Sequence, residues 1–169
     1  IEKCLDSLVT QHINKSDYEI IVIDDGSTDN SLSIIEGFSK KHANVITFFQ
    51  ENSGAAFTRN KLMKLAKGTY IYFVDADDYV ARYSLHFLLN FAISNRIDIM
   101  GFNAAVTNSH KAVEFDNPVE HLIPSEIITG PQFLKENKDL RIEIWWYLIR
   151  KDFFDRSSIY FDRSDYDGD

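Results

Sequence analysis

Cysteine is almost absent from this 169-residue chain, which contains only Cys4. A single thiol excludes an intrachain disulfide framework and fits a reducing compartment. The 3 prolines and 7 glycines are too few for a collagen-like or a Pro/Gly-rich disordered chain. No stretch approaches the roughly 18 consecutive apolar residues of a membrane-spanning helix, and no signal-peptide pattern is present. The chain begins at Ile1 inside a helical pattern, so we expect a piece of a longer protein.

Basic residues are also fewer than acidic residues. The chain has 18 Lys and Arg against 26 Asp and Glu, a formal charge of -8. This balance disfavours binding through phosphate neutralisation, so we expect no nucleic-acid partner. The 44% hydrophobic content predicts a packed globular domain. Any strongly anionic ligand of such a protein would need a cation between it and the acidic side chains.

The acidic residues are concentrated rather than spread evenly. Residues 20–30 contain three aspartates and no base, and residues 70–81 contain another three aspartates and no base. These two windows carry six negative charges between them. The acidity is therefore a property of particular segments.

Strand and helix patterns alternate over the first hundred residues. Apolar, β-branched or aromatic runs predict strands at 19–24, 45–49, 70–74 and 97–102. Apolar residues at helical spacing predict helices at 1–9, 34–41, 55–66 and 85–92, with Gly68 capping the third. This alternation indicates an α/β fold with a mostly parallel sheet. After residue 103 the regularity fades, and a short helix is expected from near Thr129.

Carboxylates follow two of the predicted strands at their carboxyl ends. Asp24 and Asp25 end the first strand, and Asp75, Asp77 and Asp78 follow the third. Ligands of open parallel sheets bind at this edge, and neighbouring or next-neighbouring strands would bring the two groups within about 5–10 Å. Grouped carboxylates repel one another, so a divalent cation with oxygen ligands is the natural partner. Asp78, like Asp29, fits a solvated loop acid or a helix N-cap instead.

Four motifs in order carry a family resemblance. They are EIIVIDDGSTD at 19–29, NSG at 52–54, TRN at 58–60 and GTYIYFVDADD at 68–78. Together they resemble the nucleotide-binding half of a family 2 inverting glycosyltransferase with the GT-A fold. That fold is a three-layer α/β/α arrangement around a mostly parallel, Rossmann-like sheet. The resemblance implies a nucleotide-sugar-binding half at 1–102 and an acceptor-side region of the same domain at 103–169.

The resemblance also implies roles for single residues. Its nucleotide-sugar contacts fall on Asp24, Asp25, Asn52, Arg59 and Asp75. Asn52 fits a plain turn equally well. Asp75 and Asp77 match the family's DxD motif, whose acids face the ribose and ligate Mn²⁺ or Mg²⁺ on the diphosphate.

Inversion requires a carboxylate base for the acceptor hydroxyl. The Glu-Asp pair that supplies it in the family is not visible here, and the chain ends in DYDGD. Asp167 is our first candidate for the base and Asp169 our second. A solvated acidic tail is the competing interpretation of both.

The resemblance implies transfer of a sugar from a nucleoside diphosphate, which we expect to be a UDP-sugar. The expected acceptor is a glycan or a lipid-linked saccharide in surface polysaccharide assembly. We expect a cytoplasmic protein, and a lipid-linked acceptor would bring it to the inner face of the membrane by peripheral association.

Two other interpretations stay open from the sequence. A phospho-receiver domain also places an acidic pair and a later Asp around magnesium, and Asp24, Asp25 and Asp75 fit that outline. The DADD motif and the aromatic segments after residue 120 argue against it. A non-catalytic module that binds nucleotide-sugars is the second alternative.

Overall fold

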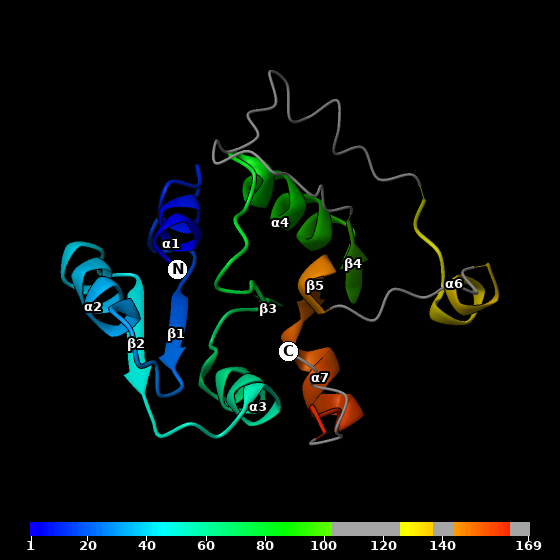
Figure 1. Ribbon diagram of the computed structural model, residues 1–169. Helices are drawn as coiled ribbons and strands as arrows, with labels where there is room; N and C mark the ends of the chain where they lie inside the picture. The colour runs from blue at the N-terminus through cyan, green and yellow to red at the C-terminus, as the bar shows by residue number, and fades with distance from the viewer. Residues whose placement is uncertain (103–125, 137–143, 163–169) are drawn as a thin grey trace.

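The computed structural model describes residues 1–102, 126–136 and 144–162. Figure 1 shows the helices and strands in chain order. The helices are α1 (Glu2–Val9), α2 (Ser31–Lys41), α3 (Ala55–Leu65), α4 (Ser84–Ser94), α6 (Gly130–Glu136) and α7 (Lys151–Ser157). The strands are β1 (Ile20–Asp24), β2 (Val45–Phe49), β3 (Tyr70–Tyr72), β4 (Ile99–Gly101) and β5 (Tyr147–Arg150). A short 3₁₀ helix, Ile144–Trp146, leads into β5.

The expected helices and strands are all present, with shifts at their ends. β3 stops at Tyr72, two residues before the predicted end. The predicted cap at Gly68 is wrong, because α3 ends at Leu65 and Ala66 is its C-cap, in an extended conformation. Gly68 instead donates its N–H to the Glu19 carboxylate at 3.2 Å. The chain thus leaves α3 through the extended Ala66, without a left-handed cap, and contacts Glu19 before it enters β3.

The described strands pair in two sets. β1 and β2 are parallel, with Ile20 opposite Val45. β5 lies between β3 and β4 and runs antiparallel to both. β3 and β4 therefore run in the same direction, as a parallel α/β alternation predicts, but they are separated by a strand from much later in the chain.

Helices cover both faces of the β3-β5-β4 sheet. Leu148 of β5 and Met100 of β4 are buried with Leu88 and Ala92 of α4 on one face. On the other face, Ile71 of β3 and Ile149 of β5 pack against α3 and α7. The period-two alternation of strand side chains thus produces a helix, sheet and helix layering.

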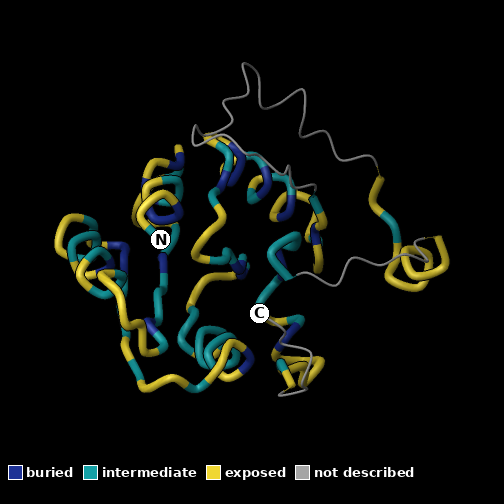
Figure 2. Tube along the Cα trace, viewed as in Figure 1, coloured by how far each residue is buried: buried dark blue, intermediate teal, exposed yellow. Residues whose placement is uncertain are grey.

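The β1-β2 pair has its own core. Leu5 and Val9 of α1 pack with Ile20 of β1, Ile35 of α2 and Val45 of β2. Leu5 is only 1% exposed. By contrast, α6 is exposed along its length, as Figure 2 shows. Within the ranges described, no helix has the length and apolar character needed to cross a bilayer.

The Glu19 carboxylate connects the start of β1 to the segment between α3 and β3. It accepts hydrogen bonds from the backbone N–H of Lys67 at 2.6 Å and of Gly68. We expect Glu19→Ala to lower the free energy of unfolding by about 1 kcal/mol, because both amides lose a charged acceptor. Urea unfolding of the protein measures this. Glu36→Ala is the matched control and should change stability by less than about 0.5 kcal/mol, since Glu36 forms only an exposed pair with Lys40.

Candidate functional site

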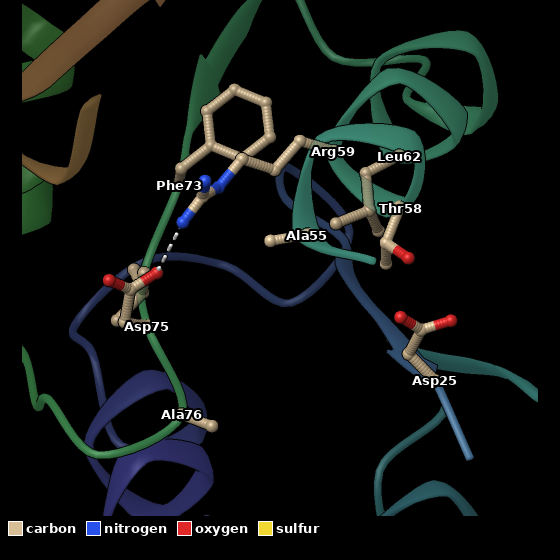
Figure 3. A pocket seen from close by; sticks show the side chains of 9 residues that line it. Asp25, Ala55, Thr58, Arg59, Leu62, Phe73, Asp75 and Ala76 are labelled. Atoms are coloured by element: carbon tan, nitrogen blue, oxygen red, sulfur yellow. Dashed lines mark hydrogen bonds and ion pairs between the residues drawn. The ribbon is translucent and has the colours of Figure 1, made fainter. Parts of the chain in front are cut away.

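A pocket of about 290 Å³ lies where the carboxyl ends of β1 and β3 meet the first turns of α3. Figure 3 shows Asp25 and Asp75 on opposite sides of it, with Arg59 and Thr58 of α3 between them. Its walls are formed by Asp25, Ala55, Thr58, Arg59, Leu62, Phe73, Val74, Asp75 and Ala76. The structure therefore brings one acid from each predicted acidic segment to a single cavity.

Asp25 is held at the N-terminus of α3. Its carboxylate accepts hydrogen bonds from Gln50 Nε2 at 2.7 Å and from the N–H groups of Ser53 and Gly54, both at 2.9 Å. Partial burial alone would raise the pKa of Asp25, but these bonds, with one from Thr58, lower it below its ordinary value. Ionised Asp25 thus holds the N-cap residue Gly54 and the residue before it, which we call the capping of α3, at the end of the helix where the dipole also favours negative charge.

This capping predicts a pH-dependent stability. At pH 7 we expect Asp25→Asn to lower the free energy of unfolding by about 1 kcal/mol, because an amide nitrogen replaces one acceptor oxygen. The folded-state pKa lies below the ordinary 3.8, so the carboxylate's contribution is complete above 3.8 and is lost as pH falls through the folded pKa.

Urea unfolding at a series of pH values measures the effect. The difference from wild type should therefore shrink below pH 3.8. Exposed Asp17, which accepts a bond from Ser16 Oγ, provides the control Asp17→Asn. An Asp25→Asn effect that stays constant down to the lowest pH would contradict the capping role.

Asp24 and Asn52 do not line the pocket. Asp24 is 5% exposed and accepts a hydrogen bond from Ser27 N–H at 3.0 Å, within its own loop. Asn52 is exposed and lies against Gly26, where an added Cβ would approach its backbone nitrogen to 3.0 Å. Gly26 also has a φ of +85°, so both close approach and backbone conformation favour glycine there. These two residues shape the loops beside the pocket.

Arg59 supplies the positive charge of the pocket. Its Nη2 lies 3.4 Å from Asp75 Oδ1, and both side chains are partly exposed. A pair of this length and exposure contributes little to stability. Arg59 instead matters for the charge of the pocket. The described lining contains the carboxylates of Asp25 and Asp75 and the guanidinium of Arg59, so its net charge is negative.

Asp77 and Asp78 lie beyond the pocket lining, on the exposed turn that follows β3. Of the two interpretations of Asp78, the structure agrees with an exposed loop acid and not with a helix N-cap, because α4 begins at Ser84 with Tyr83 as its N-cap. Desolvation, followed by repulsion from Asp77 and Asp75, raises the pKa of Asp78. The described residues contain no group of three or more His, Cys, Asp or Glu that could by themselves hold a metal ion. A cation here would need further ligands from elsewhere.

The predicted base candidates, Asp167 and Asp169, lie outside the described residues. The sequence did not predict that Thr58, Leu62 and Phe73 line the pocket. Leu62 and Phe73 are apolar residues of a predicted helix and a predicted strand, and their residue type gives no sign of a site. The bond from Gln50 to Asp25 was not predicted either. The position of Gln50 directly after β2, at the carboxyl end of that strand, could have indicated it.

Comparison with known proteins identifies the family of the chain. A model described as "Glycosyl transferase family 2" matches residues 1–155, which is most of the chain. The chain belongs to glycosyl transferase family 2. Its family membership removes the phospho-receiver alternative.

Two relatives show how much of a longer glycosyltransferase the chain matches. The chain is 35% identical over 167 residues to "Uncharacterized glycosyltransferase EpsJ" of Bacillus subtilis, covering 96% of this chain and 47% of that protein. It is 41% identical over 153 residues to "Poly(ribitol-phosphate) beta-glucosyltransferase" of Bacillus spizizenii, covering 82% of this chain and 24% of that one. The chain therefore spans half or less of the length of these relatives.

A solved structure confirms the GT-A fold class. The crystal structure of Staphylococcus aureus TarS 1-349 in complex with UDP superposes with a TM-score of 0.74 at 25% identity, covering 96% of this chain and 46% of that chain. Another TarS structure, in complex with UDP-GlcNAc, covers 94% of this chain. The antiparallel β5 is accordingly part of a family 2 domain.

Proposed function

We propose that this chain is the donor-binding part of an inverting glycosyltransferase that uses a nucleoside diphosphate sugar, with UDP as the nucleotide. The observation that carries the proposal is the convergence of Asp25, Arg59 and Asp75 on one pocket at the carboxyl ends of β1 and β3. Similarity to a TarS structure solved with UDP supports it. The roles of Asp24 and Asn52 are then to support the loops around the nucleotide rather than to line the pocket.

A divalent cation, Mn²⁺ or Mg²⁺, belongs to this proposal. Asp75 and Asp77 offer two carboxylates to such an ion. Because no group of three or more His, Cys, Asp or Glu among the described residues could hold it alone, its other ligands would be phosphate oxygens and water. Mg²⁺ in particular is commonly held by one or two carboxylates together with substrate phosphates and water. When bound, the ion would neutralise charge on the leaving nucleoside diphosphate.

Residues of the chain itself would then bind the diphosphate, position Arg59 and take up the acceptor proton. The negative lining of the pocket would repel a bare diphosphate. Among the described residues that line it, Arg59 is the one with a positive charge, and it would hydrogen-bond a phosphate from α3. Asp25 fixes the N-terminus of α3 and with it the position of Arg59, one turn along the helix. Asp167, with Asp169 as second choice, remains our candidate for the base that takes the acceptor hydroxyl's proton.

The acceptor we propose is a glycan or lipid-linked saccharide of the cell envelope. Relatives named as poly(ribitol-phosphate) glycosyltransferases support an envelope polymer. A lipid-linked acceptor would place the protein at the inner face of the membrane.

The donor is identified by thermal stabilisation of the purified full-length protein. A panel of nucleotide-sugars is added with and without Mn²⁺, and a ligand that binds the folded state raises the melting temperature. We expect a UDP-sugar to give the largest Mn²⁺-dependent shift, and release of UDP on adding envelope acceptors. Absence of a shift with every nucleotide-sugar would overturn the proposal.

A further inference from the structure

The segment that follows α7 is attached to α3 through one residue. Ile159 and Tyr160 are 50% and 72% exposed, whereas Phe161 is half-buried in the apolar cluster under α3. The contact joins positions 101 residues apart in the sequence. The sequence indicates no such pairing, and the proposed function does not use it.

Asn60 makes this attachment with both ends of its amide. Its Nδ2 donates to the carbonyl oxygen of Phe161 at 2.8 Å, and its Oδ1 accepts from the N–H of Phe161 at 2.8 Å. Two short bonds to the same backbone residue fix its orientation as well as its distance. We call this pair of bonds the Asn60–Phe161 clamp.

The clamp places the ring of Phe161 beside the pocket. The ring packs edge-on against Phe73, with centroids 5.5 Å apart and an interplanar angle of 80°. Phe73 is buried and lines the pocket. The other neighbour of the ring is Arg59, whose Cζ lies 5.9 Å from its centroid.

Arg59 thus lies between two groups, the Phe161 ring and the Asp75 carboxylate. The guanidinium is 3.4 Å from Asp75, which is a loose contact for a charged pair. Asp75 alone therefore does not define the orientation of this long side chain. An aromatic face near a guanidinium restricts it further and attracts its charge.

We propose that Asn60 is a positioning residue for the nucleotide pocket: by clamping Phe161 it holds an aromatic ring against Arg59 and keeps that guanidinium directed into the pocket. This inference rests on the proposed binding of a nucleoside diphosphate there. Asn60 itself touches no ligand, and its whole effect on nucleotide affinity passes through Arg59.

A double-mutant cycle on the full-length protein tests this dependence. UDP affinity in the presence of Mn²⁺ is measured by calorimetry for wild type, Asn60→Asp, Arg59→Ala and the double variant. Asn60→Asp retains the acceptor oxygen but, when ionised, cannot donate to the Phe161 carbonyl. We expect it to weaken UDP binding about five- to tenfold in the wild-type background and less than about twofold in the Arg59→Ala background.

A second variant and a control complete the design. Phe161→Leu keeps the backbone bonds of the clamp and removes the ring, so it should reproduce the Arg59-dependent loss even if Asn60→Asp fails to fold. Asn90→Asp, at an exposed position of α4 where Asn90 contacts His86, should leave affinity unchanged.

The possible results separate the two proposals. An equal loss of affinity with and without Arg59, or no loss from either clamp variant, would overturn the positioning role while leaving the nucleotide site intact. Failure of wild type to bind UDP would overturn the proposed function and this inference with it.

Discussion

Asp77→Ala should reduce the rate of sugar transfer by about a thousandfold. The expected loss follows from the proposed role of Asp77 as a ligand of the divalent cation, since the stabilisation that a bound cation gives to developing charge is worth several kcal/mol. The same change should remove Mn²⁺-dependent UDP binding. Calorimetry of UDP binding and a UDP-release assay with the full-length protein measure the two effects separately.

Asp29→Ala is the matched control for this prediction. Asp29 belongs to the other acidic segment, but its Oδ1 accepts a hydrogen bond from Ser31 N–H at 2.9 Å, at the start of α2. We therefore expect transfer and UDP affinity to stay within about twofold of wild type. Undiminished, Mn²⁺-dependent UDP binding by Asp77→Ala would show that the metal assignment is wrong.

Gln11→Met should lower the free energy of unfolding by about 2 kcal/mol. Gln11 is 6% exposed and lies just after α1. Its Nε2 donates to the carbonyl oxygen of Ala81 at 3.0 Å, and its Oε1 accepts from the N–H of Leu85 at 3.3 Å. Methionine has a similar size but lacks both groups, so the first turn of α4 loses a capping acceptor in a buried setting.

This side chain links α1 to the segment that follows the DADD turn. Ser7 adds to the link, because its Oγ accepts from the N–H of Val80 at 3.0 Å. Gln132→Met provides the control, since the Gln132 side chain is exposed on α6 and donates to Glu136 of the same helix. Urea unfolding should show almost no change for the control, and an equally small change for Gln11→Met would refute the capping role.

Much of the fold could be predicted because its signals are local. The apolar run before Asp24 and the one before Asp75 each mark a strand, and ligands of α/β folds bind beyond the carboxyl ends of strands, so the acids that follow these two strands were the expected site. Asp25 and Asp75 do line one pocket. The order of the four motifs was enough to indicate the family.

The parts that could not be predicted depend on contacts between distant residues. β5 is a four-residue strand preceded by tryptophans, and nothing local shows that it separates β3 from β4. Gly68 resembles a helix cap in sequence, but its N–H instead donates to Glu19, 49 residues earlier. The capping by Asp25 and the clamp by Asn60 likewise require knowing which loops meet.

The location of the donor site is tested most directly by hydrogen exchange. Amide exchange of the full-length protein is followed by mass spectrometry with and without UDP and Mn²⁺. The account predicts slower exchange in peptides covering residues 50–60 and 73–78, which contain Ala55, Thr58 and Arg59 of α3 and the turn after β3, and no change in α7. Protection confined to other parts of the protein, with these two segments unaffected by bound UDP, would contradict it.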